Sequence, residues 1–140
     1  MKKPSKNLPD TNVIVRYLVK DDPALYKKAK EFFDKVKSGG QRAVILESVI
    51  AECIYVLTKI YKVPREKAAG SLLDILHYKG IVNNDREELI ASLNFFAGSN
   101  VDIVDCILLA KSESSNSCLF SFDEGLNRFA TSTGHHDLKS

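Results

Sequence analysis

The sequence predicts an α/β fold: a three-layer α/β/α sandwich around a mostly parallel central sheet of four or five strands. Short apolar runs of strand length alternate along the chain with longer segments of helical periodicity, as in parallel sheets with right-handed crossovers. Two helical segments separate successive strand candidates, which predicts paired crossover helices. The 140 residues and 44% hydrophobic content suit a single domain over residues 1–130, followed by a polar, frayed tail at 131–140.

The first helix is predicted directly after a short entry segment that ends at Asp10. An apolar helical pattern starts at Thr11 and runs to about Val19, and either Thr11 or Asn12 can cap it. Asp10 then lies where a strand passes into a helix, which is where ligands bind in open α/β sheets. Pro9 donates no ladder hydrogen bond, so this strand must be short or irregular. Helix capping is the simpler role for an isolated Asp, so the interest of Asp10 depends on the other acids.

The next segment predicts a helix, a strand and another helix. Asp22 can cap a helix over 23–37, with Pro23 in its first turn. The apolar run 43–46 is typical of a buried parallel strand. Ser48 can cap a helix that runs to about Tyr61, and Glu52 lies inside it among apolar residues.

The second half of the chain repeats this alternation. The expected helices cover about 64–78, 86–97, a segment opening at 102, and 124–129, with strands at 81–83 and 118–122. Asp102 fits the cap of its helix, and Asp105 follows in the first turn. Asp123 directly follows the last strand.

Composition narrows the class of protein. A net charge of +2 is too small to establish nucleic-acid binding and does not oppose it. No apolar run is long enough to span a bilayer, and the basic N-terminus leads into no signal-type segment. The three cysteines, expected in apolar surroundings, form no metal-ligand pair, and His135-His136 has no partners at metal-ligand spacing. We therefore expect a reduced, cytoplasmic protein.

Four acids are predicted at one edge of the sheet: Asp10, Glu52, Asp105 and Asp123. The carboxyl ends of parallel strands share an edge, so residues far apart in sequence can meet there. Crowded carboxylates repel one another unless a cation lies among them, and oxygen ligands without His or Cys select Mg²⁺ or Mn²⁺. Such an ion can activate water for attack on phosphorus. No Ser/His pair, Cys/His pair or phosphate-binding glycine loop accompanies the acids, so metal-assisted phosphodiester hydrolysis is the predicted chemistry.

Four segments in order resemble the PIN-domain family, and most closely its VapC-type toxin ribonucleases. They are Asp10-Thr11-Asn12 with 13–18, Ser48 with 52–57, Asp105 with 106–110, and Ser121-Phe122-Asp123. The resemblance implies a Mg²⁺- or Mn²⁺-dependent endoribonuclease with an RNA substrate, frequent homodimers and, for the toxin branch, a small antitoxin partner. It implies that Asp10, Glu52, Asp105 and Asp123 hold the metal.

Further residues take supporting roles by the same resemblance. Asn12 would orient Asp10 or a bound water, with Thr11 beside it, and Ser121 keeps the hydroxyl of a Thr common in the family. Arg16 can either pair with an acid or contact phosphate. Asp102 competes with Asp105 for the third acidic place, although a cap is its simpler role.

Other functions remain open from the sequence alone. The same fold can serve a housekeeping RNA-processing nuclease or a non-catalytic RNA-binding or regulatory module. Phosphatase and phosphoacceptor domains also use sheet-edge aspartates. However, a phosphatase domain of this kind requires an Asp at the position of Asn12, and a phosphoacceptor domain requires an Asp where Asn83 or Asn84 is found.

Overall fold

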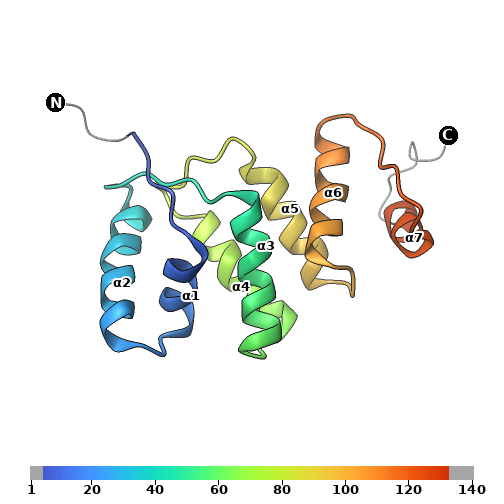
Figure 1. Cartoon of the computed structure of the whole chain (residues 1–140). Helices are drawn as coiled ribbons and strands as arrows, with labels where there is room; N and C mark the ends of the chain where they lie inside the picture. Colours follow the sequence, from blue (N-terminus) through green and yellow to red (C-terminus); the bar gives the residue numbers. More distant parts are fainter. Residues whose placement is uncertain (1–4, 133–140) are drawn as a thin grey trace.

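A computed structural model describes residues 5–132, which form an elongated helical body. Seven α-helices and one π-helix lie in this part of the chain: α1 (Thr11–Val19), α2 (Pro23–Ser38), α3 (Glu47–Tyr55), η1 (Val56–Ile60), α4 (Arg65–Leu76), α5 (Arg86–Ala97), α6 (Ile103–Ser114) and α7 (Glu124–Ser132). Figure 1 shows α1 and α2 at one end, α3, α4 and α5 in the centre, and α6 followed by α7 at the other end. The main core unites α1 to α6 together with η1, and a smaller apolar cluster joins α6 to α7.

The predicted α/β/α sandwich with its parallel sheet is wrong: residues 5–132 are all-helical and contain no sheet. What remains of the expected sheet is a pair of isolated parallel bridges, one from Asn7 to Ala43 and one from Ala43 to Ile81. Three extended segments therefore lie side by side, with the segment at Ala43 between those at Asn7 and Ile81. Each is too short to continue the pairing.

A side chain takes over where the backbone pairing stops. The Asn83 amide accepts a hydrogen bond from the backbone N–H of Ile45 (2.9 Å) and donates one to its carbonyl (2.8 Å). These are the two groups of Ile45 that a neighbouring strand would otherwise satisfy. After the bridge at Ile81, the Asn83 side chain therefore makes the hydrogen bonds to Ile45 that the backbone of a continuing strand would make.

The predicted strand at 118–122 also fails to form a strand. Leu119 is buried against Leu109 and Leu126 in the smaller cluster, which holds this segment on the outer side of α6. Phe120 and Phe122 are 85% and 92% exposed and their rings contact each other, with centroids 5.4 Å apart. No bridge joins the segment to the other extended segments within residues 5–132.

The helix predictions are largely confirmed, and their caps need correction. The helices at 11–19 and 86–97 match the predicted bounds, and Asp22 caps α2 as expected. The cap of α1 is Asp10, whose carboxylate accepts a hydrogen bond from Val13 N–H, rather than Thr11 or Asn12. Ser48 caps nothing, because α3 begins one residue before it.

Two smaller expectations also change. Cys53 and Cys106 are buried as predicted, whereas Cys118 is exposed. Residues 131–132 of the expected tail belong to α7, and the rest of the tail, including His135-His136, lies outside the described residues. None of the helices over residues 5–132 has the length and apolar character that a bilayer crossing requires.

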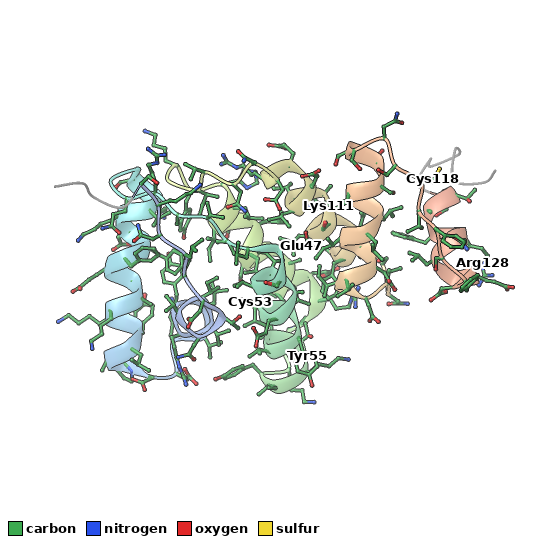
Figure 2. The ribbon with its side chains drawn as sticks, turned by 45° about the horizontal axis from the view of Figure 1, so that its top comes forward. Glu47, Cys53, Tyr55, Lys111, Cys118 and Arg128 are labelled. Atoms are coloured by element: carbon green, nitrogen blue, oxygen red, sulfur yellow. The ribbon has the colours of Figure 1, made fainter. Side chains whose placement is uncertain are left out.

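A charged contact fixes α6 against the centre of the body. The Lys111 ammonium group lies 3.1 Å from the Asp85 carboxylate, 3.4 Å from that of Glu47 and 3.8 Å from that of Glu88. Figure 2 shows Lys111 on α6 and Glu47 at the start of α3. The Lys111 ammonium group thus contacts one acid at the start of α3 and two acids at the start of α5. These contacts fix the position of α6, and with it the acidic start of this helix, relative to α3.

Candidate active site

Asp10 and Glu52 form the first half of the candidate site, at the contact between α1 and α3. The Asp10 Oδ1 accepts a hydrogen bond from Val13 N–H at 3.0 Å, which places this exposed carboxylate at the positive end of the α1 dipole. The Thr11 hydroxyl donates to Glu52 Oε1 at 2.8 Å. The residue next to Asp10 therefore holds the Glu52 side chain, and the two acids occupy one region of the surface.

The negative charge of this region affects the pKa of the Cys53 thiol. Burial, together with the negative charges of Glu52 and Asp10, raises the pKa of Cys53 to about 12. The thiol is therefore neutral at physiological pH and is not a nucleophile. Its place in the core leaves the chemistry of this region to the carboxylates.

Asp105 and Asp123 form the second half, around the start of α6. Burial raises the pKa of Asp105 above its ordinary value, and the nearby charges of Asp102 and Asp123 add to this effect. Asp123 is exposed and its Oδ1 accepts a hydrogen bond from Leu126 N–H at 3.0 Å, so it caps α7. Ser121 supports this acid, because its hydroxyl accepts a hydrogen bond from Asp123 N–H at 2.9 Å.

The two halves do not combine into one metal centre in this arrangement. Across residues 5–132, no group of three or more His, Cys, Asp or Glu side chains lies close enough to hold an ion. The donor chemistry suits Mg²⁺ or Mn²⁺, since the acids are hard oxygen ligands. The geometry supplies only pairs, so the structure as it stands does not fit the ion. The metal-ligand roles of these four acids stay a prediction.

The remaining predicted site residues have separate surroundings. Asn12 is exposed and makes no hydrogen bond to Asp10 within the described residues. Arg16 pairs with an acid: its Nη1 lies 2.8 Å from Asp21 Oδ1, and this contact raises the pKa of Arg16. Asp102 occupies the cap position of α6, although its side chain makes no capping hydrogen bond.

The structure adds Arg65, which the sequence did not single out. Its guanidinium lies 3.6 Å from the centre of the Phe96 ring and donates to the backbone carbonyls of Phe96 and Val101, at 2.9 and 2.7 Å. Arg65 lines a groove that also contains Asp102 and Asp105. One basic group and two acids therefore share this groove. Its only sequence signal is its position at the start of a helix after Pro64.

Comparison with known proteins identifies the class. The PIN domain family matches residues 8–131, nearly the whole described chain and all four predicted acids. This chain belongs to the PIN domain family, whose members are typically metal-dependent ribonucleases. Neither the curated proteins nor the solved structures contain a match to it.

Proposed function

We propose that this protein is a Mg²⁺- or Mn²⁺-dependent endoribonuclease that hydrolyses RNA phosphodiester bonds. Family membership supports nuclease activity in general. The observation that carries the specific proposal is the contact between the first two motifs, where the Thr11 hydroxyl holds Glu52 beside Asp10. Two acids from segments 42 residues apart are thereby brought to one surface, as the hydrolysis of a phosphodiester with hard-cation help requires.

The test is cleavage of a structured RNA with Mg²⁺ or Mn²⁺ by the wild-type chain, Asp10→Asn and Glu52→Gln. Each substitution removes one charge with little change in volume. We expect each to lower the cleavage rate by more than about 100-fold, since even outer-shell partners of metal sites are typically worth 10–100-fold. Calorimetric titration should show that both variants also bind Mn²⁺ more weakly than the wild type. Circular dichroism checks that both variants stay folded.

A matched control is Glu31→Gln, which removes the same charge from an exposed position on α2. It should cleave at the wild-type rate. Equal rates for Asp10→Asn and Glu31→Gln would refute the role of Asp10. Rates that need no divalent ion would refute the metal dependence.

A non-catalytic RNA-binding or regulatory module of the same fold is the second candidate. It is favoured by the absence, across residues 5–132, of any three acids close enough for an ion. The two functions separate cleanly. A module of this kind would bind RNA with neither cleavage nor a divalent-ion titration signal.

We further propose that the nuclease is the toxin of a toxin–antitoxin pair, with a small antitoxin protein as its partner. The support is the resemblance of the four motifs to VapC-type toxins. Induced expression of the wild-type chain should arrest growth, and Asp10→Asn should relieve the arrest. A small reading frame beside the gene, whose product restores growth, would supply the partner. Harmless overexpression with intact RNase activity would indicate a housekeeping nuclease instead.

A further inference from the structure

The charges of the chain are divided unevenly between its first 42 residues and the rest. Residues 1–42 contain eleven Lys and Arg and five Asp and Glu, a formal net charge of +6. Residues 43–140 contain nine Lys and Arg and thirteen Asp and Glu, a net charge of −4. The small overall charge of +2 therefore conceals a basic region, and such an asymmetry is typical of proteins that bind polyanions.

Five basic residues gather where the three extended segments begin. The two bridges between these segments are parallel, so the amino ends of the segments share one edge. Lys6 and Arg42 directly precede bridge residues, and Lys79 lies two residues before one. The last turn of α2 adds Lys35 and Lys37 at the same edge. We call these five residues the basic cluster.

Backbone contacts hold the parts of the basic cluster together. The Arg42 carbonyl accepts a hydrogen bond from Asn7 N–H at 2.8 Å, which fixes the loop after α2 to the entry segment. A methyl group added at Gly39 would lie 3.1 Å from Lys79 Cδ, so the Lys79 stem crosses the turn that ends α2. Figure 1 shows the end of α2 and the entry segment together at the end of the body marked N.

The basic cluster has no acidic partner. None of its five side chains forms an ion pair within residues 5–132, and the nearest acid along α2, Asp34, is paired with Lys30 at 2.7 Å. The dipole of α2 favours Lys35 and Lys37 at its C-terminal end. The other three cluster residues lie outside the helices, so no ion pair in the described part of the chain offsets their mutual repulsion. A bound polyanion would offset it.

The surroundings of the basic cluster favour a phosphate backbone over a protein or a membrane. All five side chains are exposed, and none of the exposed large apolar residues described between positions 5 and 132 lies within 35–42 or 77–79. A protein interface has an apolar core, and a membrane-binding surface inserts apolar side chains. Contacts with phosphate oxygens need only exposed Lys and Arg. Charge without apolar surface therefore favours a nucleic-acid strand as the partner.

The basic cluster lies within reach of the candidate active site. Lys6 and Asp10 are four residues apart, and an extended chain of this length spans at most about 14 Å. The cluster precedes the amino ends of the extended segments, whereas Asp10 follows the carboxyl end of the first one. An RNA strand carries a phosphate at every nucleotide, so a single strand can contact both places.

We propose that the basic cluster is a second RNA-contact surface, which binds the phosphate backbone several nucleotides away from the bond that the acids cut. Phosphate contacts carry no base information, so the cluster selects RNA by length and not by sequence. An RNA too short to span both places is a poor substrate. The cutting step rests on the proposed nuclease function, whereas the phosphate contact does not.

The first test measures binding without cleavage. Fluorescence anisotropy in EDTA follows the binding of a labelled oligouridylate RNA to the wild type and to Lys37→Gln/Arg42→Gln/Lys79→Gln. Each lost phosphate contact lowers the slope of log affinity against log salt by about 0.7, so the triple substitution should lower it by about 2. At about 0.1 M salt this corresponds to an affinity loss of about 100-fold.

The matched control is Lys27→Gln/Lys62→Gln/Lys67→Gln, which removes three charges from exposed positions near the starts of α2 and α4. The basic cluster lies at or beyond the other ends of these helices, so the control should bind RNA with nearly the wild-type affinity. Circular dichroism checks that both variants stay folded. Equal losses in the two variants would overturn the cluster as a defined surface. A wild type that binds phosphatidylserine vesicles and not RNA would overturn RNA as its partner.

The second test measures cleavage with Mn²⁺. For an RNA that spans both places, the cluster variant should raise KM by about 100-fold with kcat nearly unchanged, because the contact is made equally in the ground state and the transition state. Cleavage with the wild-type KM would overturn the contact and leave the nuclease function intact. A wild type that cleaves no RNA, yet loses RNA binding on the triple substitution, would overturn only the proposed nuclease function.

Discussion

Gly80→Ala is the substitution with the sharpest expected cost. Gly80 lies between α4 and the bridge at Ile81, where the chain passes closely over the preceding segments. A methyl group added there would lie 2.0 Å from the Gln41 carbonyl oxygen and 2.8 Å from that of Val36. Both contacts are with backbone, which no side-chain rotation can relieve. The chain must therefore move.

The size of the effect follows from what that movement breaks. Gly80 N–H donates to Val36 at 2.8 Å, and the Gly80 carbonyl accepts from Ala43 N–H at 2.8 Å. Losing both bonds costs about 1 kcal/mol each, and displacing packed backbone costs about 1–3 kcal/mol more. We expect the free energy of unfolding to fall by about 3–5 kcal/mol, a large part of the 5–15 kcal/mol typical of a domain.

Urea unfolding followed by circular dichroism measures this change, and the melting temperature should fall by roughly 10–20 °C. Gly70→Ala is the matched control. Nothing lies within 4 Å of the methyl group it adds in α4. Alanine favours a helix over glycine by about 1 kcal/mol, so this variant should be slightly more stable than the wild type. A Gly80→Ala protein within 1 kcal/mol of the wild type would refute the close packing of the extended segments.

Two further predictions concern the contacts that hold the site in place. Asn83→Ala leaves the buried backbone N–H and C=O of Ile45 without partners, so urea unfolding should show a loss of about 2–4 kcal/mol; an unchanged midpoint would contradict the role of the amide. The hydrogen bond from Arg16 lowers the pKa of Asp21 in the folded state. This contact therefore stabilises the fold fully at pH values above the ordinary Asp pKa, and the stabilisation is lost as the pH falls through the lowered pKa. The melting temperature of the wild type should therefore exceed that of Asp21→Asn at about pH 6 and approach it near about pH 2, and a difference that grows on acidification would contradict the pairing.

The helices were predictable because their determinants are local. The spacing of Leu89, Leu93 and Phe96 defines the inner face of α5, and all three are buried. The β interpretation failed because a strand exists only through a partner far away in sequence. The run 43–46 has the composition of a buried strand, and Ala43 and Ile45 are indeed fully buried. It nevertheless finds single bridges and an Asn83 side chain in place of continuous neighbours.

For the candidate site, too, the features set by neighbouring residues were predictable, and those set by distant contacts were not. The position of Asp10 at the start of a helix was predictable, because a capping acid and the apolar pattern after it are adjacent in sequence. The contact between Thr11 and Glu52 required only that α1 and α3 pack together. The distance from Asp10 to Asp123 depends instead on the direction in which the chain leaves α6, and no residue pattern within 115–123 specifies that direction.

The charges of the site make a further demand on any active form. Asp105 is partly buried and lies near two other acids, which raises its pKa, so its ionised form is held at a cost in this arrangement. A cation that brought the acids together would remove that cost, whereas bringing them together without one would increase it. Binding of the ion and assembly of the four acids should therefore be thermodynamically coupled. This coupling has a measurable form: Mn²⁺ should raise the melting temperature of the wild type, and it should do so far less for Asp123→Asn. A melting temperature that Mn²⁺ leaves unchanged in the wild type would mean that the acids do not assemble around the ion.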